Sequence, residues 1–241
     1  MAGEPGIGKT RLVAEFAREL HEEGAAVLWG RSSEEALSPY QPFVQALQHH
    51  VRSAPLEELR EQVGASADLL VRLLPDVRSR LPVPEPQLLE EPESERYRLF
   101  EAVGHLLAAA SAERPIVLVL DDLQWADQGT LLLLKHVARD AVPAPLLLLG
   151  TYRQSEIGRD HALALVKADV ERDRIVEHIE LSGLVEEEIT TLVGDLVGWR
   201  PPTEVAQRLH GETGGNPSSS RRSCVTSSSS ASAPTQSASP A

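Results

Sequence analysis

The sequence GEPGIGKT at residues 3–10 decides the fold class, and it lies at the start of this 241-residue chain. It matches the full pattern G-x-x-x-x-G-K-[ST], in which a glycine-rich turn leads into a helix. The glycines let the backbone turn tightly and point several N–H groups inward, which makes an anion-binding loop at the start of that helix. Because short glycine-rich patterns also occur by chance, the interpretation depends on the rest of the chain.

A phosphate-binding loop of this kind gives each of its residues a predicted place in a nucleotide site. The Lys9 ammonium is placed for the β- and γ-phosphates, and the Thr10 hydroxyl is placed to ligate Mg²⁺. The residues that we expect to contact the nucleotide are Gly3, Glu4, Pro5, Gly6, Ile7, Gly8, Lys9, Thr10 and Arg11.

Two carboxylates follow the continuous apolar run at residues 116–120, which is too short for a helix and predicts a buried strand. In a parallel α/β sheet, ligands bind at the carboxyl ends of the strands. Asp121 would hold Mg²⁺ through its water shell, and Asp122 would orient or activate the attacking water. The alternative is an ordinary buried strand followed by an acidic helix cap. The loop at residues 3–10 favours the metal-binding interpretation.

A second apolar strand, predicted at residues 146–150, delivers Thr151, Tyr152 and Arg153. The guanidinium fork matches phosphate geometry, so we predict that Arg153 senses the terminal phosphate. The alternative role for Arg153 is a surface ion pair.

The remaining pattern predicts an α/β chain in which a parallel sheet has helices on both faces. We expect an ATPase core at residues 1–182, the start of a helical lid at 183–217 and a disordered tail at 218–241. The predicted helices cover residues 12–20, 43–51, 97–110, 131–137, 161–170, 189–196 and 203–211, with Asp127 as an N-cap; further strands are predicted at 25–29 and 174–181.

Charge and composition exclude several classes of partner. The net charge of −13 disfavours nucleic acid, and no apolar run approaches the length of a membrane span. The tail 218–241 has eleven serines, two arginines and no acidic residue, too few apolar groups to fold. The single cysteine and the lack of a secretory leader suit a cytoplasmic protein.

Taken together, these motifs resemble the ATPase module of the STAND branch of the AAA+-like P-loop ATPases, the AAA ATPase domain family of large LuxR-type ATP-binding regulators. The stretches that carry the resemblance lie between residues 3 and 217: GEPGIGKTRL at 3–12, GRSSEE and SPYQPF within 30–43, VLVLDDLQWAD at 117–127, LLLLGTYR at 146–153 and GETGGNP at 211–217.

The resemblance implies that Lys9 and Thr10 bind the nucleotide and Mg²⁺. It implies that Asp121 and Asp122 are the acidic pair and that Arg153 stands at the sensor position. It also implies that ATP or ADP switches a larger protein between inactive and signalling forms. Self-association or partner proteins are then expected to act through domains outside this chain.

The chain departs from the family at both ends. Family members have an apolar strand directly before the loop, where this chain has Met1 and Ala2, and the expected strand order puts it between the strands at 146–150 and 174–181. At the other end, the family continues from GGNP into an apolar helix, whereas this chain becomes serine-rich. We therefore expect a P-loop fold that lacks its first strand, in a chain truncated at both ends.

The leading hypothesis is a Mg²⁺-dependent ATP hydrolase that acts as the switch module of a multidomain signalling or transcriptional regulator. The alternative is a fragment that binds nucleotide or partner proteins without turnover. A GTPase is disfavoured because the sequence has no N-K-x-D motif, and a small-molecule kinase would need an acceptor site that the sequence does not identify. DNA binding would have to come from a helix-turn-helix domain outside this chain.

Overall fold

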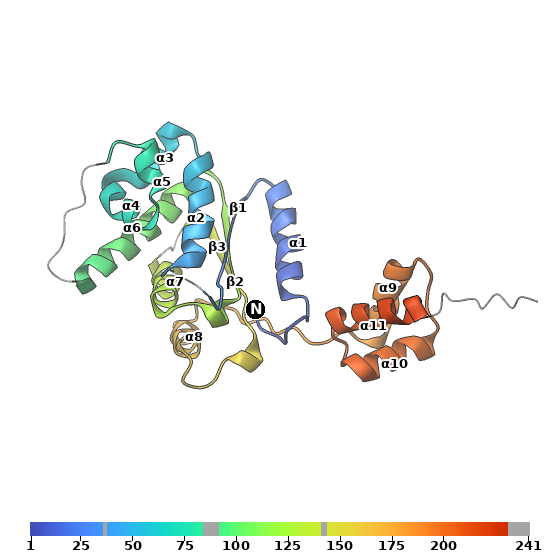
Figure 1. Cartoon of the computed structure of the whole chain (residues 1–241). Coiled ribbons are helices and arrows are strands. Elements are labelled where there is room, and N and C mark those ends of the chain that lie inside the picture. Colours follow the sequence, from blue (N-terminus) through green and yellow to red (C-terminus); the bar gives the residue numbers. More distant parts are fainter. Residues whose placement is uncertain (36–37, 84–91, 141–143, 231–241) are drawn as a thin grey trace, which may run out of the picture. The chain divides into compact units, whose positions relative to one another are not determined.

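The computed structural model describes residues 1–35, 38–83, 92–140 and 144–230. Contacts divide the chain into two units (Figure 1). The sheet unit comprises Met1–Ala2 and Thr10–Ile179, and the helical unit comprises Gly3–Lys9 and Glu180–Ala241.

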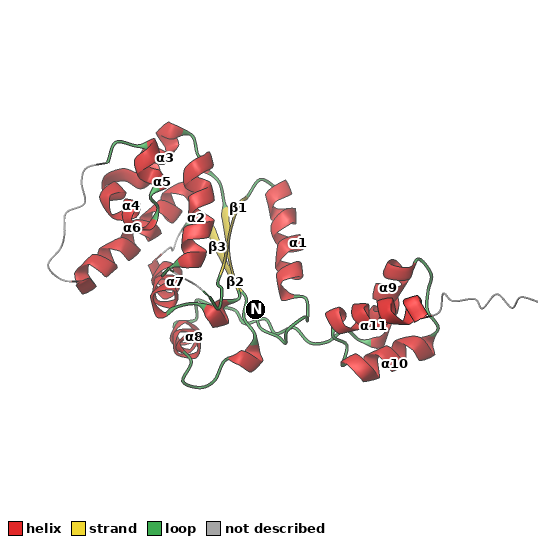
Figure 2. Cartoon of the chain, in the orientation of Figure 1, coloured by secondary structure: helices red, strands yellow, loops and turns green. Residues whose placement is uncertain are grey.

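A parallel sheet forms the centre of the sheet unit (Figure 2). Its described strands are β1 (Ala26–Arg31), β2 (Ile116–Asp121) and β3 (Leu146–Gly150), in the order β1-β2-β3. Every residue of β2 is buried, as expected for a parallel strand covered on both faces. The register aligns Arg31 with Asp121 and Leu120 with Gly150, so the carboxyl ends of the three strands meet at one edge.

Helices flank both faces of this sheet, because alternate residues of each strand point to opposite sides. Val117 and Val119 pack with Val13 of α1 (Lys9–Glu22) on one face. Ile116 and Leu118 belong to the larger core on the other face. That core is completed by α2 (Gln41–Ser53), α3 (Leu56–Val63), α4 (Ala67–Leu73), α5 (Asp76–Arg80), α6 (Pro92–Glu113), α7 (Gln128–Asp140) and α8 (Ala162–Arg172). Short 3-10 helices η1 (Gly64–Ser66), η2 (Leu123–Trp125) and η3 (Gln154–Glu156) lie between these elements.

The helical unit contains α9 (Glu186–Val197), α10 (Thr203–Thr213) and α11 (Pro217–Ser230). Its small core consists of Ile189 and Val193 from α9 with Ala206 and Leu209 from α10, and Cys224 of α11 packs against it. By its contacts, the loop segment Gly3–Lys9 belongs to this unit.

The structure confirms the predicted helices at 12–20, 43–51, 97–110, 131–137, 161–170, 189–196 and 203–211 and the strands at 25–29, 116–120 and 146–150. Asp127 is the predicted N-cap of α7, because its Oδ1 accepts a hydrogen bond from Thr130 N at 3.0 Å. The proline-rich segment at residues 81–92 lies largely outside the described residues.

Two predicted segments differ from the structure. The strand at 174–181 is wrong, because these residues form no ladder; in the sheet unit, Ile179 O accepts a backbone hydrogen bond from Ala2 N at 2.8 Å. The unfolded tail is also wrong for residues 218–230, which lie in α11. Composition misses this helix because its start is capped by Asn216 and its Cys224 packs on the unit's core. Residues 231–241 lie outside the described part of the chain.

The edge of β3 that faces away from β2 is partly covered by the first two residues of the chain. The Met1 amino group donates to Gly150 O at 2.7 Å, and Tyr152 N donates to Met1 O at 3.1 Å. Beside the rest of β3 lies an apolar groove of about 720 Å³, which residues 175–179 line on the other side. Three strands are present in the described residues, and Met1 and Ala2 lie beside the end of the third.

Candidate functional site

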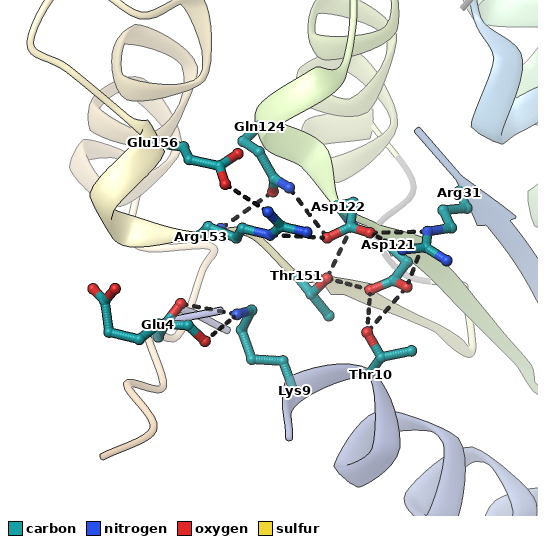
Figure 3. Close-up of polar contacts among 11 residues, drawn as sticks. Glu4, Lys9, Thr10, Arg31, Asp121, Asp122, Gln124, Thr151, Arg153 and Glu156 are labelled. Atoms are coloured by element: carbon teal, nitrogen blue, oxygen red, sulfur yellow. Dashed lines mark hydrogen bonds and ion pairs between the residues drawn. The ribbon is translucent and has the colours of Figure 1, made fainter. Parts of the chain in front are cut away.

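A cluster of oxygen atoms forms where β2 and β3 end, within the sheet unit (Figure 3). Asp121 is 1% exposed, and the Thr10 hydroxyl lies 3.0 Å from its Oδ1 and 3.1 Å from its Oδ2. The Thr151 hydroxyl donates to Asp121 Oδ1 as well. The two hydroxyls therefore hold the buried carboxylate in one orientation.

Asp122, the next residue, has a left-handed backbone conformation with φ of 57°. This conformation is uncommon outside glycine, although Asp and Asn tolerate it better than bulky residues. Its backbone N–H donates to the Thr151 hydroxyl at 3.0 Å. The Asp122 carboxylate contacts Arg31 at the end of β1.

Arginines lie on two sides of the Asp122 carboxylate. Arg31 Nε and Nη2 donate to Oδ2 at 2.8 and 2.5 Å, while Gln124 Nε2 donates to Oδ1 at 3.1 Å. Arg153 Nε is 3.9 Å from Oδ1. The hydrogen bonds to Asp122, together with the charge of that carboxylate, raise the pKa of the Arg31 guanidinium. Both oxygens of Asp122 thus have positively charged or amide neighbours.

Arg153 is held by three groups besides Asp122. Its Nη1 donates to Glu156 at 2.6 Å, its guanidinium lies 4.6 Å from the centre of the Trp125 ring, and its backbone N–H donates to Gln124 Oε1 at 3.2 Å. The arginine that we predicted as a phosphate sensor therefore lies at the acidic pair, with a defined orientation.

The loop at residues 3–9 has the backbone that its glycines predict. Gly6 and Gly8 have φ values of 78° and 105°, which side chains rarely allow. Lys9 Nζ donates to the backbone oxygens of Gly3 at 2.8 Å and Glu4 at 3.0 Å. In this structure the lysine thus closes the loop on itself.

The structure brings Thr10, Asp121, Asp122 and Arg153 together in the sheet unit (Figure 3). Glu4 and Lys9 contact each other within the helical unit, and Ile7 N donates to Glu4 O at 3.2 Å. Arg11 is exposed on α1. The roles of all these residues remain predictions.

Sequence reasoning missed the groups that surround Asp122. Arg31 lay inside the stretch GRSSEE, but nothing in that stretch indicated a contact with Asp122; the β1–β2 register places Arg31 beside the acidic pair. Gln124 and Trp125 lay inside the stretch VLVLDDLQWAD, but nothing in that stretch indicated that they hold Arg153. Thr151 was recognised as a strand end without its hydrogen bond to Asp121.

The oxygen cluster fits Mg²⁺ by the chemistry of its donors. A hydroxyl and a carboxylate, from Thr10 and Asp121, are the hard oxygen ligands that this ion prefers. Within the described residues, no three His, Cys, Asp or Glu side chains form a metal cluster. Mg²⁺ needs none, because one or two carboxylates plus substrate phosphates commonly bind it.

Among the described residues, no helix has both the length and the apolar character needed to cross a membrane. A search of curated proteins finds no match to the chain. A model of the AAA ATPase domain matches residues 1–149, which include the loop, all of β1 and β2 and most of β3. Arg153 and the helices from α8 onward lie beyond the matched range. Since the match covers more than half of the chain and includes both Thr10 and the Asp121–Asp122 pair, the chain belongs to the AAA ATPase domain family.

Proposed function

We propose that the chain binds ATP with Mg²⁺ and hydrolyses it. The observation that carries this proposal is the hydrogen bond between Thr10 and the buried Asp121, with Asp122 as the next residue. It joins the last residue of the phosphate-loop motif to an acidic strand end, as a metal-dependent phosphoryl-transfer site requires. The family match supports the same chemistry.

In the proposed reaction, Thr10 and Asp121 would hold Mg²⁺, whose charge would offset the negative charge of the nucleotide phosphates. The loop N–H groups bind the phosphates, and Lys9 exchanges its bonds with Gly3 O and Glu4 O for a phosphate oxygen. Asp122 would orient the attacking water and accept its proton while the bond from the γ-phosphorus to the β–γ bridging oxygen breaks and ADP leaves. Arg153 stabilises the negative charge that develops on the terminal phosphate.

The neighbours of Asp122 make nucleotide binding without turnover a second candidate function. Oδ2 already accepts from Arg31 and Oδ1 from Gln124, so a water would have to share or displace these donors. If they stay in place, the site binds nucleotide but positions no water.

Phosphate release from Mg-ATP by the purified chain separates these functions. Asp122→Asn is expected to reduce release by about 10² to 10⁴-fold while nucleotide binding persists, because the amide cannot accept a proton. Lys9→Ala is expected to lose both binding and release. Asp173→Asn is the control, since Asp173 pairs with Arg139 outside the site.

Binding without Mg²⁺-dependent release by the unaltered chain would support the second function and contradict the first. A melting temperature that Mg-ATP fails to raise would exclude both, because a ligand of the native state must stabilise it by mass action.

At a larger scale, we propose an ATPase core at residues 1–182 and a lid that begins at 183–217. The chain would serve as the switch module of a STAND-like regulator of the LuxR type, with self-association or partner proteins acting through other domains. The stretches GETGGNP at 211–217 and LLLLGTYR at 146–153 resemble the STAND ATPase module, and this resemblance supports a role in a regulator of that kind. A cytoplasmic location follows from the same proposal.

A further inference from the structure

The backbone oxygens at the start of the phosphate loop all accept hydrogen bonds inside the helical unit. Lys9 Nζ bonds to the oxygens of Gly3 and Glu4. Asn216 Nδ2 donates to Pro5 O at 2.9 Å, and the Ser218 hydroxyl donates to Gly6 O at 2.8 Å. Two of these four carbonyls are thus fixed by residues more than 200 positions away in sequence.

Carbonyl direction matters in a loop that binds anions. The N–H and C=O groups of a peptide plane point in opposite directions, so a carbonyl fixed on one side directs the attached N–H to the other. A phosphate is bound by the N–H groups and repelled by a carbonyl oxygen. The group that anchors the Pro5 carbonyl therefore favours the Gly6 N–H direction that a phosphate needs, and the groups on the Gly6 carbonyl fix the peptide plane whose N–H, that of Ile7, donates to Glu4 O at 3.2 Å in this structure.

The amide side chain of Asn216 both accepts and donates hydrogen bonds here. Its Oδ1 accepts from Ser218 N at 3.1 Å and Ser219 N at 3.2 Å, which caps the start of α11. Its Nδ2 is then left to donate to Pro5 O. Asp, Ser and Thr can also cap a helix, but none of them carries an amide donor. Asn216 is the only asparagine of the chain.

The turn before Asn216 is itself fixed in place. Leu184 N donates to Gly215 O at 2.8 Å. An added Cβ would lie 2.1 Å from Gly214 O at Gly183 and 2.3 Å from Leu184 O at Gly215. Only glycine allows the two segments to approach this closely, and their packing sets the position from which Asn216 reaches the loop.

We propose that Asn216 and Ser218 are positioning residues for the phosphate loop, so that the GGNP segment sets nucleotide affinity through the carbonyls of Pro5 and Gly6. This inference rests on the proposed nucleotide binding. The two residues contact the loop backbone and act through it.

The test measures Mg-ADP and Mg-ATP affinity by titration calorimetry, together with the melting temperature of the nucleotide-free protein. Asn216→Ser keeps a cap acceptor but removes the amide donor, so affinity should fall about tenfold while the melting temperature without nucleotide stays unchanged. Ser218→Ala removes the hydroxyl bond to Gly6 O and leaves the cap and the 3.3 Å bond from Ser218 N to the same oxygen, and it should weaken binding by a smaller factor than Asn216→Ser does. Ser219→Ala is the matched control, since the Ser219 hydroxyl bonds to Arg222 and not to the loop.

Wild-type affinity in both Asn216→Ser and Ser218→Ala would overturn the inference. If Asn216→Ser instead lowers the melting temperature of the nucleotide-free protein, the test depends on Ser218→Ala. Normal nucleotide affinity in Ser218→Ala would overturn the inference. Weakened affinity at an unchanged melting temperature would support it. Failure of the unaltered chain to bind nucleotide would remove the proposed function, and the inference with it.

Discussion

At the scale of single residues, the Asp122 carboxylate accepts hydrogen bonds from Arg31 and Gln124 and lies 3.9 Å from Arg153 Nε. Arg31 ends β1, Gln124 belongs to η2, and Arg153 follows β3. A buried carboxylate is costly unless its oxygens are satisfied, and Asp122 is only 5% exposed. The strand ends are therefore joined through this one side chain.

We predict that Arg31→Gln destabilises the protein by about 1 kcal/mol. A hydrogen bond to a charged group is worth more than this, but the Arg31 side chain is 58% exposed and solvent screens the pair. Urea denaturation measures the change. Arg18→Gln is the control, because Arg18 pairs with Glu15 and Glu22 on the surface of α1 and should have no measurable effect. Equal stabilities of the two variants would show that Asp122 does not need Arg31.

At the scale of elements, Asp127 links the start of α7 to the start of α2. Its Oδ1 accepts from Thr130 N, and its Oδ2 accepts from the Thr130 hydroxyl and from Tyr40 N at 3.1 Å. Tyr40 itself has a φ of 61°, so this bond helps to hold an uncommon conformation before α2.

Asp127→Ala is expected to cost about 2 kcal/mol, at the upper end for an N-cap, because it also removes the acceptor for Tyr40 N. Asp127→Asn keeps one acceptor oxygen and should recover at least half of that loss. Chemical denaturation of both variants gives the comparison, and a neutral effect of Asp127→Ala would contradict the assigned cap.

The reactivity of the Cys224 thiol can be used to measure whether α11 packs on the core of the helical unit. Partial burial raises the pKa of its thiol above the ordinary value of 9.0. Because the thiolate is the reactive form, alkylation at pH 8 to 9 should be slower in the native protein than in urea. The ratio of the two rates should be largest below the unfolded pKa and should fall toward one as the pH rises above the folded pKa. Equal rates in both states would show that α11 does not pack on the core of the helical unit.

The sequence predicts the elements that have a strong local pattern. The apolar strands at 116–120 and 146–150 and the cap at Asp127 were correct because each depends on neighbours in sequence. The strand predicted at 174–181 failed because a strand also needs a paired backbone, which a local sequence pattern cannot guarantee. Arg31 beside Asp122 and Asn216 beside Pro5 depend on residues 91 and 211 positions apart, which no local pattern encodes.

At the scale of the whole molecule, acid should destabilise the sheet unit through carboxylates that bond between helices. The hydrogen bond and charge of Lys135 lower the pKa of Asp169, and the hydrogen bond from Gln48 and the pair with Arg52 lower the pKa of Asp76. A folded pKa below the unfolded value stabilises the protein above the unfolded value, and this contribution is lost as the pH falls through the folded pKa.

We therefore predict a melting temperature that falls as the pH drops below about 4, near the ordinary pKa of Asp. Asp169→Asn should lower the melting temperature at pH 7 and flatten the part of the profile below pH 4. Thermal denaturation across this range tests the prediction. A wild-type profile in Asp169→Asn would contradict a contribution from the Lys135 pair.

The position of Asn216 directly before Pro217 affects how readily this asparagine loses its side-chain amide by deamidation during storage. Asparagine usually converts to aspartate when the backbone nitrogen of the following residue attacks the side-chain amide and closes a ring. The nitrogen of proline carries no hydrogen, so this route is blocked at the chain's only asparagine. Stored protein should keep the amide that bonds to Pro5 O, and with it the chemical identity of the contact between α11 and the loop.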